Sequence, residues 1–228
     1  MRAVVILLMF LLASCGRFPP QQTQYGGQQQ FQQPAQNFSR EYIPSIKSPS
    51  GALVSGSLRL SETYGKGRVG MEFTYGHSGA VEVKAADVSL LLGFEDLGQS
   101  SFDHAGSDLI FFRPIGLSLD VLASGSSAIE VDWNRVSLIS PSEQIYKVIH
   151  KGQRFQDRGM PSSPSIIPPG SRLSDFVFPS DLISFELRNW RLGHFFERID
   201  KGGTFGLFFP VKSGASEIQY HIVFTVVE

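Results

Sequence analysis

The chain closes on Ile218-Gln219-Tyr220-His221-Ile222-Val223-Phe224-Thr225-Val226, in which large apolar side chains recur at every second residue. Successive side chains of a β-strand point to opposite faces, so this period of two predicts a strand with one fully apolar face. Val223 and Val227 make the second face partly apolar, as expected of a strand that is covered on both sides. This closing strand sets the expected class of the fold.

Alternation of the same kind recurs in shorter segments upstream, and Gly, Pro, Ser and Asp residues separate these segments. The spacing predicts about ten short strands joined by turns. Between Trp133 and Val136 the alternation slips by one residue, which predicts a β-bulge. Asn189–Ile199 could form a short helix, and no longer segment has a helical apolar stripe with caps. The predicted strands comprise residues 53–60, 69–75, 81–85, 109–112, 117–122, 129–139, 144–150, 173–178, 183–187, 205–211 and 218–227.

These strands favour an all-β domain over residues 41–228, of a length that one domain commonly has. The preferred architecture is an antiparallel β-sandwich of the immunoglobulin or fibronectin type. It would have no disulfide, because Cys15 is the only cysteine of the chain. A small closed β-barrel is the alternative.

The N-terminus carries the features of an export signal. Arg2 precedes the apolar run Ala3 to Leu12, which is too short to span a bilayer as a helix. Leu12-Ala13-Ser14-Cys15 then resembles the lipobox of bacterial lipoproteins. The alternative is an ordinary signal peptide with a stray cysteine.

The lipobox resemblance implies that residues 1–14 are a leader removed by signal peptidase II and that Cys15 receives two or three acyl chains. More than one chain gives stable membrane anchoring. Gly16, rather than Asp, follows the cysteine. In the lipoprotein family this difference implies the outer membrane, with the domain facing the periplasm or the cell surface.

Residues 15–40 have a different composition from the rest of the chain. This stretch is rich in Gln, nearly uncharged and without apolar periodicity, so it predicts a disordered linker. A flexible chain of this length has a root-mean-square reach of about 30 Å. The linker would hold the domain clear of the lipid head groups; the alternative is that the Gln tract itself binds peptidoglycan or a partner.

Charge and cysteine content exclude several function classes. The chain has 20 Lys and Arg against 21 Asp and Glu, so it lacks the basic surface of a nucleic-acid-binding protein. An acylated Cys15 leaves the domain without a thiol. The five histidines are scattered singly, with no spacing typical of a metal site. We therefore predict no metal, no cofactor and no nucleic-acid partner.

The proline-rich stretch from Lys151 to Arg172 predicts a long loop, and long loops in compact domains are often functional. His150, Arg154, Asp157 and Arg158 at its start are candidate partner-binding residues, since arginine can hold a carboxylate with two hydrogen bonds. The alternative is that Asp157 pairs with one arginine and fixes the loop.

A further candidate is Trp190, in the aromatic segment Trp190–Phe196. Exposed aromatics of this kind suit a partner or a sugar ring. Burial of the same side chains at one end of the domain is the alternative.

Five segments resemble those of uncharacterised bacterial lipoproteins: Val131-Asp-Trp-Asn134, Ile139-Ser-Pro141, Val148-Ile-His-Lys-Gly152, Phe155-Gln-Asp-Arg158 and Ile167-Pro-Pro-Gly170. That resemblance implies no activity.

Two functions remain open. The first is a membrane-anchored, non-enzymatic module that binds or assembles with an envelope protein. The second is a glycan-binding or glycan-hydrolysing envelope protein, for which two carboxylates in an aromatic cleft would be needed. Carboxylates gather loosely at Glu95, Asp96, Asp103 and Asp108, and a solvated loop explains them equally well.

Overall fold

The computed structural model describes residues 37–66, 71–99, 101–105 and 108–227. Cys15, the predicted leader and most of the predicted linker lie outside these residues. The described part is all-β, as predicted, with four single-turn 3₁₀ helices. The strands are β1 (Asn37–Ser48), β2 (Leu53–Lys66), β3 (Met71–Ala85), β4 (Val88–Asp96), β5 (Ser101–Ala105), β6 (Asp108–Phe112), β7 (Ile115–Ala123), β8 (Ile129–Val131), β9 (Ser137–Ile139), β10 (Ile145–His150), β11 (Ser165–Ile167), β12 (Arg172–Pro179), β13 (Ile183–Glu186), β14 (Asn189–Leu192), β15 (Thr204–Ser213) and β16 (Ser216–Val226).

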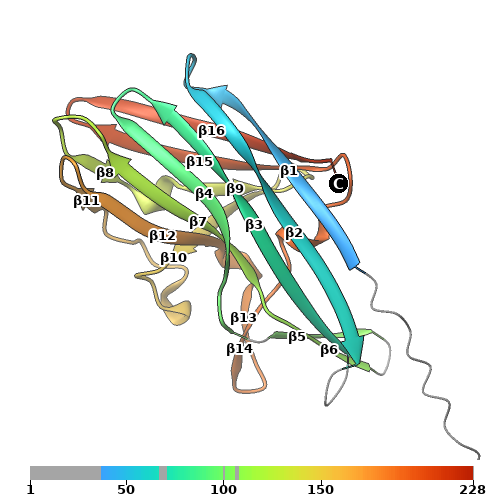
Figure 1. Ribbon diagram of the computed structural model, residues 1–228. Coiled ribbons are helices and arrows are strands. Elements are labelled where there is room, and N and C mark those ends of the chain that lie inside the picture. Colours follow the sequence, from blue (N-terminus) through green and yellow to red (C-terminus); the bar gives the residue numbers. More distant parts are fainter. Residues whose placement is uncertain (1–36, 67–70, 100, 106–107, 228) are drawn as a thin grey trace, which may run out of the picture. The chain divides into compact units, whose positions relative to one another are not determined.

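Ten of these strands form one antiparallel sheet that closes on itself (Figure 1). Their order is β15-β16-β1-β2-β3-β4-β7-β12-β10-β9, and β9 pairs back with β15. The structure therefore fits the alternative of a small β-barrel. The preferred immunoglobulin-like sandwich is not confirmed, because a sandwich has two separate sheets, whereas hydrogen bonds link these strands around a ring.

The barrel interior is filled by the apolar face of each strand. On β16, Tyr220, Ile222, Phe224 and Val226 are all buried, as the alternation predicts. Aromatic rings pack against one another in this core, for example Phe205 on Phe224 with ring centroids 4.6 Å apart. Burial of this apolar area, at roughly 25 cal/mol per Å², is the main source of the fold's stability.

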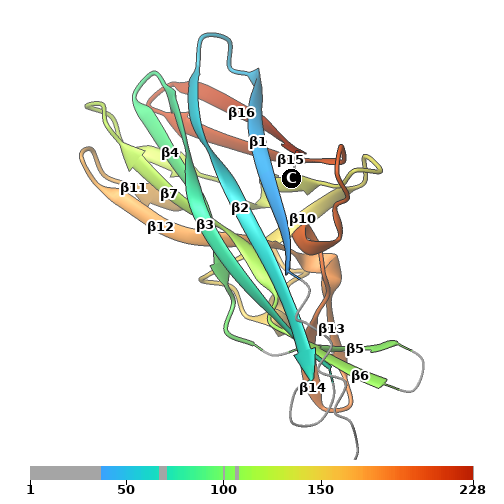
Figure 2. The same cartoon turned by 45° about the vertical axis from the view of Figure 1, so that its right-hand side comes forward.

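At one end of the barrel the β2–β3 ribbon separates from β4. The last pair between β3 and β4 is Val81 with Leu92; beyond it β3 continues with β2 and then pairs in parallel with β6. Gly56 and Gly79 lie at this point, with φ of +90° and +82°, a backbone conformation that only glycine adopts easily. Figure 2 shows the ribbon extending beyond the barrel toward β5 and β6.

Three local predictions differ from the structure. The 3₁₀ helix η1 (Trp133–Arg135) divides the predicted strand 129–139 into β8 and β9. The Asp132 side chain accepts a hydrogen bond from the Asn134 N–H and so caps this helix. The slip in the alternation therefore marks a helical turn, and the predicted β-bulge is wrong. The short helix considered for Asn189–Ile199 is instead β14 followed by the turn η4 (Phe196–Arg198), because β14 pairs with β13. The linker assigned to residues 15–40 overlaps β1, which pairs with β2 from Asn37 onward.

Among the described residues, no helix is long and apolar enough to cross a bilayer.

Candidate functional site

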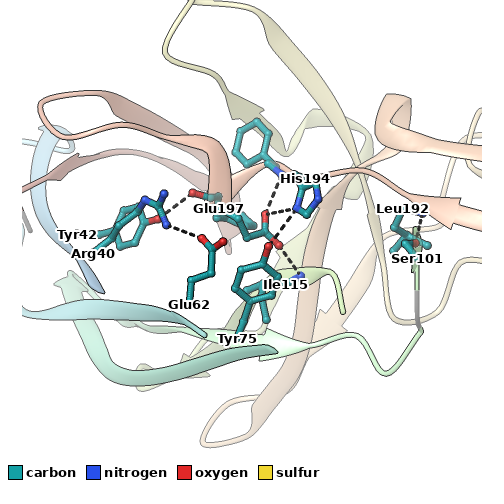
Figure 3. A network of polar contacts seen from close by, with 11 residues as sticks. Arg40, Tyr42, Glu62, Tyr75, Ser101, Ile115, Leu192, His194 and Glu197 are labelled. Carbon is teal, nitrogen blue, oxygen red and sulfur yellow. Dashed lines mark hydrogen bonds and ion pairs between the residues drawn. The ribbon is translucent and has the colours of Figure 1, made fainter. Parts of the chain in front are cut away.

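A pocket of about 370 Å³ opens where the β2–β3 ribbon leaves the barrel. We call it the end pocket. Strands β1, β2, β3 and β6 and the segment around η4 contribute its wall, and Figure 3 shows its polar contacts. The lining residues are Arg40, Glu62, Phe73, Tyr75, Ile110, His194, Glu197, Arg198 and Asp200.

Glu197 is the most deeply buried charged residue of the end pocket, at 4% exposure. Its Oε1 accepts a hydrogen bond from the Ile115 N–H at 3.2 Å, and its Oε2 accepts one from the Phe195 N–H at 3.0 Å. Desolvation by burial raises the pKa of Glu197 to about 7, although these backbone hydrogen bonds favour the charged form. The side chain thus joins η4 to the start of β7.

The Tyr75 hydroxyl lies 3.5 Å from His194 Nδ1, and the same nitrogen lies 4.0 Å from Glu197 Oε2. The imidazole of His194 stacks on the Phe112 ring, with centroids 3.6 Å apart. Burial raises the pKa of Tyr75, so its hydroxyl stays protonated and can donate. Glu62, the cross-strand partner of Tyr75, pairs with Arg40 at 3.3 Å.

These contacts determine what the end pocket can do. Aromatic rings and side chains of both charges surround it, which suits a small polar molecule. Both oxygens of Glu197 accept main-chain hydrogen bonds, which fix the orientation of its carboxyl group. The geometry therefore suits binding of such a molecule in this pocket.

His150 does not lie on the surface, contrary to its place among the predicted partner-binding residues. It is 9% exposed, its Nδ1 lies 3.2 Å from Asp175 Oδ2, and its ring stacks on Trp133 at 4.3 Å. Asp175 also accepts hydrogen bonds from the Lys151 and Phe176 N–H groups. His150 therefore packs the end of β10 against β12 and η1.

Arg158 and Trp190 are brought together, as a shared binding surface would require. The Arg158 guanidinium lies over the Trp190 ring at 5.3 Å, and Phe155 contacts the same ring edge-on at 6.0 Å. Arg154 precedes the 3₁₀ helix η2 (Phe155–Asp157) and is exposed. In the part of the chain that the structure describes, Asp157 makes no ion pair, so an aspartate–arginine pair is not what fixes this loop.

Two hollows flank this loop, one of about 250 Å³ and a shallower one of about 770 Å³. Lys147 and Arg158 line both of them. Met160, 66% exposed, borders the first, and Ile145, 68% exposed, borders the second. We call this surface the loop face and define it by Ile145, Lys147, Arg154, Arg158 and Met160.

Part of the aromatic segment Trp190–Phe196 is buried in the core, and part of it lies near the surface. Phe195 and Phe196 are buried in the barrel core, whereas Trp190 is half-buried beside the loop face.

Of the loosely clustered carboxylates, Asp96 pairs with Arg113 at 3.3 Å, and the side chains of Asp103 and Asp108 lie outside the described residues. Over residues 37–66, 71–99, 101–105 and 108–227, no group of three His, Cys, Asp or Glu residues is placed to hold a metal ion.

Several residues of these sites were not predicted from the sequence. Glu62 and Tyr75 fit the ordinary alternation of their strands, so the sequence does not mark either of them as a site residue. Glu197 could have been noticed, because it follows Phe195-Phe196 in a segment whose neighbours are apolar. Lys147 lies in a strand with weak alternation, and its role depends on a loop that folds back beside it.

Comparison of the chain with protein-family models, with curated proteins and with solved structures finds no match. Its function is therefore argued from the sites described above.

Proposed function

We propose that this protein is a membrane-anchored lipoprotein of the bacterial envelope, whose β domain is a non-enzymatic interaction or assembly module. Acyl chains on Cys15 hold it on the outer membrane, facing the periplasm or the cell surface. The partner is an envelope protein, and the loop face is the surface that binds it. The composition of the loop face is the observation that carries this proposal.

Two strongly exposed apolar side chains, Ile145 and Met160, lie beside the cations Lys147 and Arg158 on the loop face. Arginine, methionine and aromatic residues are enriched in protein interfaces, where a few of them supply most of the binding energy. Trp190 adds an aromatic ring next to Arg158. This mixture suits a protein partner better than a small ligand.

The loop that forms this surface is held in one shape. Asn134 and Ser162 exchange two hydrogen bonds of 2.8 Å, one in each direction. The Gln153 amide donates to the carbonyl oxygens of Asp157 and Met160. A surface that is already ordered loses less conformational entropy on binding, so these bonds favour affinity.

Glycan binding in the end pocket is the second candidate. Three carboxyl groups, of Glu62, Glu197 and Asp200, line that pocket together with the rings of Phe73 and Tyr75. Aromatic faces and polar side chains of both charges suit a sugar. The hydrogen bonds to both oxygens of Glu197 hold its carboxyl group in place as part of such a binding site.

Site-specific photo-crosslinking in intact envelopes tests the interaction module. A photoreactive residue at position 147 or 154 is expected to capture one discrete protein, and the same residue at Lys47, exposed on β1, is the control that captures none. Lys147→Glu should weaken the interaction about thirtyfold, as loss of one hot-spot contact of about 2 kcal/mol does. Equal capture at positions 47 and 147, insensitive to Lys147→Glu, would contradict the assignment of the loop face.

A further inference from the structure

The β13–β14 hairpin exposes apolar side chains at its tip. Phe185 is 58% exposed and Leu187 is 77% exposed. Leu187 and Arg188 form the two-residue turn, with φ of 49° and 68°. Two positive φ values are typical of a type I′ turn, in which Asn-Gly is the favoured pair. A strained, exposed leucine at such a position is better explained by a contact outside the domain than by the stability of the turn.

The base of this hairpin is firmly attached, so its tip is held in place. Ile183 and Leu192 are buried, and the Leu192 N–H donates to Ser101 Oγ at 2.9 Å. Between base and tip, Phe185 and Trp190 are paired across the strands with ring centroids 5.1 Å apart. Figures 1 and 2 show the hairpin projecting from the barrel beside β5 and β6.

The described chain begins at the same end of the domain. Asn37, the first residue of β1, pairs with Thr63, which lies three positions before the end of β2 at Lys66. At that end Met71–Phe73 of β3 pair with β6, which pairs with β5, the strand that holds the base of the hairpin. Strand β1 thus begins at the end of the domain from which the hairpin projects.

We propose that this end of the domain faces the membrane and that the tip of the β13–β14 hairpin inserts into the surface of the lipid bilayer. The proposal rests on the lipid anchor proposed above. From Cys15 to Asn37 there are 22 residues, which span at most about 75 Å, so the tip can reach the bilayer that holds the acyl chains. Apolar side chains of such an element enter the boundary between head groups and acyl chains.

The residues beside the tip fit this environment. Tryptophan is enriched at the membrane–water interface, where its ring is apolar and its N–H is polar, and Trp190 is half-buried next to Phe185. Arg188 in the turn is exposed and can reach lipid phosphate while its stem stays in the apolar layer. A second copy of the chain or a protein partner on the tip would leave lipid out of contact with it.

Quenching of tryptophan fluorescence by brominated phosphatidylcholine tests the proposal. The full-length lipidated protein, reconstituted in such vesicles, is expected to lose much of the emission of Trp190. The chain has only two tryptophans, and Trp133 is 2% exposed inside the barrel. The Trp190→Phe variant, whose emission comes from Trp133 alone, should therefore be quenched far less.

Two leucine variants complete the design. Leu187→Asp should lose most of the quenching of Trp190 and still float with the vesicles. Leu53→Asp is the matched control, because Leu53 is 71% exposed on β2 where that strand pairs with Lys84, far from the tip along the ribbon. If the wild type floated without selective quenching of Trp190, insertion of the hairpin tip would be overturned and the lipid anchor would stand. Failure of the wild type to float would overturn the anchor, and this proposal with it.

Discussion

The Gly56→Ala substitution is expected to lower the free energy of unfolding by about 3 kcal/mol. The added Cβ would lie 2.0 Å from the carbonyl oxygen of Ala80, which belongs to the paired strand and cannot move without breaking the ladder. A left-handed conformation costs a residue other than glycine roughly 1–2 kcal/mol. Overpacking against backbone adds about 1–3 kcal/mol. Gly56 pairs with Val81, where the β2–β3 ribbon leaves β4, so the substitution acts at the base of the ribbon.

Gly65→Ala on the same strand is the matched control. Gly65 has an ordinary φ, and nothing lies within 4 Å of the position of its Cβ. Its substitution should change the stability by less than about 0.5 kcal/mol. Thermal unfolding of both variants measures the difference, which corresponds to roughly 10 °C for a domain of this size. Equal midpoints for the two variants would mean that the bend does not require glycine at position 56.

Stability should fall by about 2 to 3 kcal/mol between pH 5 and pH 8 because of Glu197. Its pKa is about 7 in the folded protein, against 4.5 for an unperturbed glutamate, so between these values the folded state holds a proton that the unfolded state has lost. Where the folded state binds more protons, stability decreases as the pH rises. The contribution is therefore complete below about pH 4.5 and lost above about pH 7.

Denaturant unfolding of the wild type and of Glu197→Gln at both pH values isolates this effect. Two other groups also contribute to the pH dependence of stability. Burial lowers the pKa of His221, so its contribution has the opposite sign. Hydrogen bonds from Arg135 and Gln219 lower the pKa of Glu217 to about 2, so Glu217 acts at lower pH. Both groups are present in both proteins, so their effects cancel in the difference. If the variant kept the same pH dependence as the wild type, Glu197 would not be the group responsible.

Alternating side chains predicted most strands correctly, because that period depends only on which face of a strand is buried. The alternation of β16 is the clearest case. It did not distinguish a barrel from a sandwich, since both bury one face of each strand. Closure depends on Ser137–Ile139 pairing with Gly206–Phe208, a short contact between segments that are distant in the sequence.

Local sequence indicated only some of the residues at the candidate sites. Arg158 and Trp190 were predicted as binding residues and lie in contact, but their contact is between segments distant in the sequence, and their role in binding stays a prediction. His150 resembled a surface residue at a strand end, but Trp133 and Asp175, both distant in the sequence, bury it. The end pocket forms where a bent ribbon leaves the barrel, which no local pattern indicates.

Fractionation of cells that produce the wild type or Cys15→Ser tests the central claim, that acylation of Cys15 holds this domain at a membrane. The wild type should remain in the membrane fraction after an alkaline wash, since two or more acyl chains anchor stably. Cys15→Ser should be released by the wash, because contact through one hairpin is too weak to hold it. Retention of Cys15→Ser in the washed membranes would contradict the account.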